Sequence, residues 1–219
     1  TGVQTCALPI CRNIEGDDLN TALTKADLNW TVSKQPIYSL NGNDDTVVTT
    51  SKFFATIRQD KNTMLGVVGP DYVPVQNIEL AYLCERLQGN DVKIETAGSL
   101  NGGSRVWIQM RGNAFGVGEK KDENIPMTLF TNGHDGQWPL SSLPTCTRVI
   151  CQNTLNMALG GAKKNNMIIS MKHVGDMSAR LEQMISAIEQ WKDRTEDFQD
   201  KAQLLGHTQV NTEFVQKFW

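Results

Sequence analysis

One expected strand carries alternating basic and aromatic side chains that suit the binding of a single-stranded nucleic acid. Successive side chains of a strand point to opposite faces, so residues 105–111 place four such groups on one face: Arg105, Trp107, Gln109 and Arg111. Lys93 lies on the expected partner strand. Guanidinium groups bind phosphates, and an indole stacks on a base with about 1–3 kcal/mol. The alternative is that Trp107 is covered by the long C-terminal helix and the arginines flank it.

His134 and Asp135 follow one another in a polar turn and are weak candidates for acid–base catalysis or metal binding, with His173 as a third group. The Asn-Gly and Asp-Gly pairs around them are also ordinary turn sequences, and adjacent side chains on a turn commonly diverge. The pattern favours a structural turn and leaves a metal-dependent hydrolase as an alternative. Glycine pairs elsewhere lack the lysine and the strand-to-helix context of a phosphate loop, so we expect no cofactor and assign no metal ligands.

The segment 145–151 is expected to be a strand that leads directly into a helix opened by Asn153. Arg148 on this strand would need a partner if buried, and the pattern leaves open an ion pair with Asp135 and a phosphate contact. Cys151 would need a lowered pKa to act as a nucleophile, which the start of the helix would help to provide. No histidine is close in sequence, which favours a packed thiol. No strong motif supports an enzyme.

Charge is distributed unevenly along the chain. The net charge of −3, from 21 Lys and Arg against 24 Asp and Glu, argues against a strongly basic nucleic-acid-binding protein. Residues 136–175, however, contain no acid but include Arg148, Lys163, Lys164 and Lys172. A local basic patch is therefore expected, and Lys163 and Lys164 join the candidate nucleic-acid-binding residues.

Apolar spacing and turn residues predict an α+β fold: a mainly antiparallel sheet built from hairpins with packed short helices, followed by a long C-terminal helix. The expected helices cover 17–27 and 77–88, the latter with Cys84 on its buried stripe. The other expected elements are an extended segment at 30–38, hairpins at 53–58 with 64–68 and at 93–97 with 105–111, and strands ending at 130, 151 and 171.

From Asp176 onward, apolar residues recur at alternating steps of four and three, which predicts a helix on the order of 45 Å long. Such a helix either crosses the whole domain or projects and pairs, so a homo-oligomer formed through 177–205 is one expectation. No apolar run approaches the roughly 20 residues that a bilayer requires, so no membrane partner is expected. Cys146 and Cys151 would point to opposite faces of one strand, which favours unpaired thiols and a reducing, cytoplasmic location.

Three regions follow from these patterns. Residues 1–10 have the sequence of a translated sequencing adapter and are expected to be an artefact. Residues 11–174 are expected to form the α+β domain. Residues 175–219 are expected to be a truncated helical segment, because an apolar periodic pattern that begins at Asn211 is interrupted by the end of the chain at Trp219.

Several short sequences, in order over residues 28–173, resemble a bacterial family found in phages and plasmids, the phage/plasmid-like proteins or domain of unknown function 932 (DUF932). They are Leu28-Asn29-Trp30, Gln35-Pro36-Ile37-Tyr38, Leu65-Gly66-Val67-Val68-Gly69, Tyr72-Val73-Pro74-Val75-Gln76-Asn77, Thr96-Ala97-Gly98-Ser99-Leu100, Gly102-Gly103, Val106-Trp107, Asn132 with His134-Asp135-Gly136, and Arg148-Val149-Ile150-Cys151-Gln152-Asn153-Thr154-Leu155. A tryptophan-histidine-glycine segment expected ahead of the first helix is missing. The resemblance implies a mobile-element setting in the bacterial or phage-infected cytoplasm rather than an activity. A more distant similarity, to single-strand annealing recombinases, is one of topology.

The leading hypothesis is a phage or plasmid accessory protein that binds single-stranded nucleic acid, with annealing or recombination as its role and without catalysis. The first alternative is a protein-interaction module, such as a host-defence antagonist, to which the acidic balance and the heptad pattern point. The second alternative is the metal-dependent hydrolase that uses His134 and Asp135.

Overall fold

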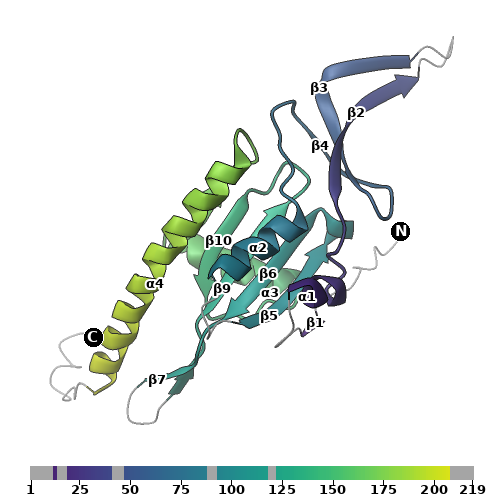
Figure 1. Ribbon diagram of the computed structural model, residues 1–219. Helices are drawn as coiled ribbons and strands as arrows, with labels where there is room; N and C mark the ends of the chain where they lie inside the picture. The colour runs from purple at the N-terminus through teal and green to yellow at the C-terminus, as the bar shows by residue number, and fades with distance from the viewer. Residues whose placement is uncertain (1–11, 14–18, 41–46, 88–92, 118–121, 208–219) are drawn as a thin grey trace, which may run out of the picture.

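The computed structural model describes residues 12–13, 19–40, 47–87, 93–117 and 122–207, and its antiparallel sheets and helices confirm the α+β class. The largest sheet has the order β1-β5-β6-β9-β10-β11, and the strands β2, β3 and β4 form a second sheet (Figure 1). The strands of the large sheet are β1 (Arg12–Asn13), β5 (Lys93–Leu100), β6 (Arg105–Arg111), β9 (Met127–Gly133), β10 (Leu140–Thr145) and β11 (Ile169–Met171). The remaining strands are β2 (Val32–Leu40), β3 (Val47–Arg58), β4 (Thr63–Val68), β7 (Phe115–Val117) and β8 (Asp122–Asn124).

The hairpin of β5 and β6 lies between β1 and β9 in the large sheet, and a short 3-10 turn, η1 (Asn101–Gly103), connects its strands. Gly103 has φ +111°, a conformation that residues with a side chain rarely adopt. A Cβ at this position would lie 2.9 Å from the Trp30 ring. Glycine is therefore required both by the backbone and by the indole that packs on the turn.

Helices cover both faces of the large sheet. Val106, Ile108 and Met110 point to the face that packs against α1 (Leu19–Lys25), α2 (Asn77–Leu87) and the first turns of α4 (Met177–His207), as the alternation in the sequence predicts. The helix α3 (Gln152–Lys164) packs on the opposite face (Figure 1). Apolar residues on both faces mean that the sheet is the central layer of the fold.

The prediction of a strand at 145–151 is wrong in its position. The observed strand is β10, Leu140–Thr145, whose Leu143 pairs with Leu129 of β9, while residues 146–151 leave the sheet and lead into α3. The apolar Val149 that suggested a strand is fully buried against α3 instead. Cys146 and Cys151 therefore do not share a strand, and the argument from opposite faces does not apply to them.

The β2–β3 ribbon extends beyond the end of β4 and projects from the body of the fold (Figure 1). β4 pairs only with residues 54–58 of β3, and β2 pairs with β3 on the other side. We call residues 36–40 and 47–53 the arm. None of the helices in the described part of the chain is long and apolar enough to cross a membrane.

Candidate functional site

Trp107 points to the predicted face of β6, but its side chain is 0% exposed. It packs in an apolar cluster with residues of the neighbouring strands and of α3: Leu129, Leu143, Val149, Leu155, Ala158 and Ala162. The expectation that this face is open to solvent is therefore wrong, because α3 and the segment before it cover the face. The covering helix is not the long C-terminal one. Trp107 stabilises the core and cannot stack on a base.

Gln109 is also fully buried, where its amide holds the segment before α3 against the sheet. Its Nε2 donates to the Thr147 carbonyl at 2.8 Å, and its Oε1 accepts from the Val149 amide at 2.8 Å. Thr96 Oγ1 donates to the Val149 carbonyl at 2.9 Å. Buried amides that satisfy backbone groups in this way have a structural role, so Gln109 is not available to a ligand.

Three of the predicted basic residues gather at the end of β5 and β6. The Glu95 side chain is 8% exposed and forms an ion pair with Arg148, whose Nε lies 2.8 Å from Oε1. Its Oε2 lies 3.8 Å from Arg111 Nη1. Lys93 is directly opposite Arg111 in the β5–β6 pair. The predicted partner of Arg148 was Asp135. That prediction is wrong because residues 146–151 cross the sheet towards β5 instead of continuing along β10. We call Lys93, Arg111 and Arg148 the basic end.

Arg105 lies at the other end of β6 and does not join this group. Its Nε is 3.6 Å from Asp135 Oδ2, and its guanidinium lies 4.3 Å from the centre of the Trp138 ring. Asp135 Oδ1 also accepts the backbone N–H groups of Gln137 and Trp138. Arg105 and Asp135 thus close the turn after β9 together with Trp138.

The outer surface of α3 connects the basic end with Lys163 and Lys164, which are exposed in the last turn of the helix. A helix of 13 residues is about 20 Å long. Between its ends, Gly160 and Gly161 are exposed, and a Cβ at either position would have no neighbour within 4 Å. Glycine costs about 1 kcal/mol relative to alanine inside a helix, and packing within the described chain does not require it here.

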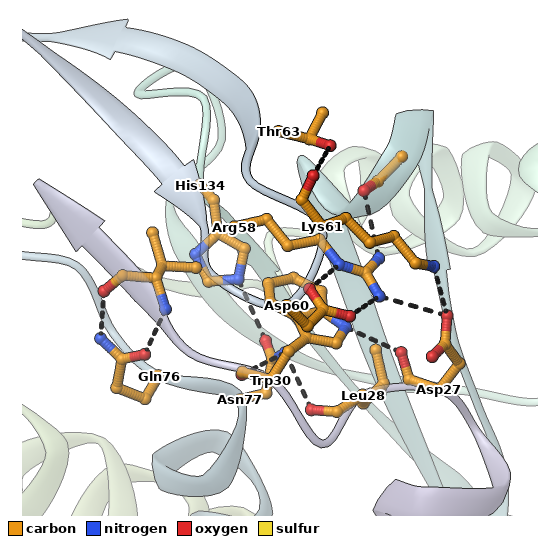
Figure 2. Close-up of polar contacts among 12 residues, drawn as sticks. Asp27, Leu28, Trp30, Arg58, Asp60, Lys61, Thr63, Gln76, Asn77 and His134 are labelled. Atoms are coloured by element: carbon orange, nitrogen blue, oxygen red, sulfur yellow. Dashed lines mark hydrogen bonds and ion pairs between the residues drawn. The ribbon is translucent and has the colours of Figure 1, made fainter.

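His134 is buried where the turn after β9 meets β3 and α2 (Figure 2). Its Nε2 lies 3.0 Å from Asn77 Oδ1. The Asn77 amide nitrogen donates to the Leu28 carbonyl at 3.0 Å, so Oδ1 is an acceptor and His134 Nε2 carries the proton. Burial, with a smaller contribution from His173, lowers the pKa of His134 to about 3. The imidazole is therefore neutral at physiological pH.

Sequence reasoning missed Arg58, which is 2% exposed beside this histidine. Its guanidinium lies 4.3 Å from the Trp30 ring centre and pairs with Asp27 and Asp60 (Figure 2). Trp30 in turn makes an edge contact with His134, and Thr56 Oγ1 donates to the His134 carbonyl at 2.6 Å. Arg58 and Thr56 lie on the same side of β3. The sequence feature that could have identified Arg58 is Asp60, an acidic residue two positions later. We call Trp30, Arg58, Asn77 and His134 the junction.

The side chains of His134 and Asp135 diverge. His134 contacts Asn77 inside the junction, whereas Asp135 faces Arg105 and the turn. His173 stacks on Tyr72 and holds the Val73 carbonyl through Nδ1. Within the described residues, no three His, Cys, Asp or Glu side chains form a group that could hold a metal ion. The geometry thus gives the hydrolase alternative no support.

Cys151 caps the start of α3, where hydrogen bonds with Thr154 lower its thiol pKa, and Cys146 is exposed. Cys84 is buried on α2, and burial raises the pKa of its thiol. We predict that iodoacetamide at pH 8 modifies Cys146 and Cys151 in the folded protein and Cys84 only after unfolding. Peptide mass spectrometry measures each site, with Cys151→Ser as the control. Rapid native modification of Cys84 would contradict the buried position.

A family model described as "Domain of unknown function (DUF932)" matches residues 64–219. No curated protein and no solved structure matches the chain. The matched residues include α3, the basic end and the turn that carries His134, while the β2–β3 ribbon precedes the match. Because the model covers most of the chain, as the sequence resemblance predicted, the protein belongs to the DUF932 family.

Proposed function

We propose that the protein binds nucleic acid through the phosphate backbone, along the outer surface of α3 from the basic end to Lys163 and Lys164. The observation that carries the proposal is that residues 136–175, which contain no acid, include β10, α3 and β11. One side of the sheet is therefore covered by a helical layer without negative side chains of its own. Phosphates are attracted to such a surface even though the whole chain is slightly acidic.

The arrangement of charges around α3 fits a chain of phosphates. Lysines occupy one end of the helix, and the basic end, where Glu95 lies close to two guanidinium groups, occupies the other. Positive groups are thus separated by about the length of α3, 20 Å, which corresponds to the axial rise of about six nucleotides of one strand in B-form DNA. Gly160 and Gly161 lie between them and allow a backbone to approach the helix closely.

The exposed residues of α3 favour contacts with phosphates over recognition of bases. They are Asn153, Asn156, Met157, Gly160, Gly161, Lys163 and Lys164, and none is aromatic. Because Trp107 is buried, base stacking supplies no affinity at this surface. We therefore expect binding that depends mainly on phosphates, with little sequence preference. Annealing would follow only if two strands bind neighbouring copies of this surface.

Fluorescence anisotropy with a labelled 20-nucleotide strand tests the proposal. Up to five phosphate contacts give a salt slope of about −3.5 for single strands, so affinity should fall about 100-fold between 50 and 200 mM salt. The double variant Lys163→Gln/Lys164→Gln should bind more weakly, and the magnitude of its salt slope should be smaller by about 1.4. The matched control is Lys61→Gln, another exposed lysine, which lies in the turn between β3 and β4 and pairs with Asp27. Equal binding by both variants would remove α3 as the site.

The protein-interaction alternative is favoured by one observation, the exposed apolar side chains of the arm. Tyr38 is 61% exposed, and Val47, Val48 and Phe53 are each more than half exposed. A host-defence antagonist would bind no oligonucleotide at 50 mM salt and would retain a host protein in a pull-down. The mobile-element setting, the cytoplasmic location and self-association through 177–205 remain predictions from the sequence.

A further inference from the structure

The positive charges assigned to the α3 surface are confined to the two ends of the helix. Residues 149–162 contain no charged side chain, whereas the basic end lies before the first turn and Lys163 and Lys164 lie in the last. A single strand that followed the helix would hold its inner phosphates over the neutral stretch, where none of these cations could neutralise them. The spacing instead suits two separate backbones, one at each end of α3.

The major groove of duplex DNA separates two backbones by a matching distance. Its opening is about 12 Å wide, so a helix about 20 Å long that lies across it extends roughly 4 Å over the backbone on each side. The minor groove is about 6 Å wide, so each end of the helix would extend roughly 7 Å beyond its edge, which is the poorer match. The ends of α3, and not its middle, therefore meet phosphates when the helix spans the major groove.

The exposed side chains between the two ends suit this position over a groove. Asn153, Asn156 and Met157 are exposed and uncharged, and they would cover the open groove, where no phosphate has to be neutralised. Gly160 and Gly161 come one turn before the lysines, so the helix surface there is reduced to its backbone and a line of phosphates can lie against it. A site for single strands would instead use aromatic side chains for stacking, and α3 exposes none.

We propose that the nucleic acid is duplex DNA and that α3 spans its major groove, with Lys163 and Lys164 on one backbone and the basic end on the other. The inference rests on the proposed binding of phosphates at α3 and specifies the substrate class of that surface. Arg148 and Arg111 have side chains that are 46% and 33% exposed, so both can reach a phosphate. Five contacts with a duplex give a salt slope of about −4.5, against about −3.5 for a single strand.

Fluorescence anisotropy with three labelled probes of one sequence tests the proposal. They are a 20-base-pair DNA duplex, its single strand, and a hybrid duplex in which one strand has an uncharged methylphosphonate backbone. At 100 mM salt the full duplex should bind at least about 10-fold more tightly than either other probe, because only the duplex offers phosphates to both ends of α3. The salt slope for the hybrid should be about half that for the full duplex. Equal affinity and slope for the hybrid would overturn the two-backbone arrangement.

A bulky side chain at Gly160 tests the close approach of one backbone. A Cβ at this position has no neighbour within 4 Å, and glutamine favours a helix more than glycine does, so Gly160→Gln should fold. Its affinity for the full duplex should nevertheless fall at least about fivefold, because the added side chain separates the helix from the phosphates. The matched control is Ala179→Gln, an exposed position of α4, whose first turns pack on the opposite face of the sheet. Circular dichroism and the unfolding midpoint verify that both variants are folded, and equal duplex binding by the two would overturn the close approach.

The three probes also separate this inference from the proposed function. A single strand that binds as tightly as the duplex, or more tightly, would overturn duplex DNA as the substrate while phosphate binding at α3 still stands. Absence of binding to all three probes at 50 mM salt would remove both proposals.

Discussion

Replacing Trp107 by alanine is expected to lower the free energy of unfolding by about 3–5 kcal/mol. The indole is 0% exposed and fills the space between β6, β9, β10 and α3. Truncation removes its buried apolar area and leaves a cavity that the surrounding strands cannot close. Urea denaturation followed by circular dichroism measures the change, and Trp107→Phe, which keeps most of the volume, should lose less.

The matched control is Tyr82→Ala, an aromatic residue on α2 that is 53% exposed. Its loss should change the stability by much less, because most of its ring is already in contact with water. The outcome that contradicts the core assignment is a Trp107→Ala protein of nearly wild-type stability that has lost oligonucleotide binding. That result would restore Trp107 as a stacking residue and would require the α3 layer to open.

Acidification is expected to destabilise the fold steeply, with His134 as one principal cause. The pKa of His134 is about 3 in the folded protein, against about 6.5 when the chain is unfolded. The unfolded chain therefore binds the proton first as the pH falls. The stabilisation that results from this pKa difference is fully present above about pH 6.5. It is lost progressively as the pH falls towards 3, and the total loss is about 5 kcal/mol.

His173 contributes in the same direction, because burial also lowers its pKa. The measurement is the urea midpoint at half-unit steps from pH 7.5 to 4. His134→Gln keeps an amide that can donate to Asn77 but removes the titration, so its stability should decline less over this range. Equal slopes for His134→Gln and the wild type would show that folding does not lower the pKa of His134.

Local patterns were sufficient for much of the fold. The alternation in residues 105–111 placed Val106, Ile108 and Met110 on the inner face of β6, and the structure places them in the core. The turn between Arg58 and Met64 predicted the β3–β4 hairpin, which the structure contains. These features depend on residues that are close in the sequence, where spacing determines which side chains share a face.

The candidate site was less predictable, because alternation shows which side chains share a face but not what covers that face. Trp107 and Gln109 were correctly paired on one side of β6, and α3 then covered them. Glu95 is far from Arg148 in the sequence, and only the crossing of residues 146–151 over the sheet brings the two together. The environment of Arg58 is likewise formed by three separate segments, residues 27–30, 58–60 and 102 (Figure 2).

The β2–β3 ribbon that carries the arm contacts the body of the fold at its base, where Thr56 and Arg58 enter the junction. Its outer residues contribute no side chain to either apolar cluster among the described residues. Strand pairs near the tip can therefore be gained or lost with little effect on folding free energy, since longer loops cost little entropy. The length of this ribbon can therefore change while the fold beneath it stays unchanged.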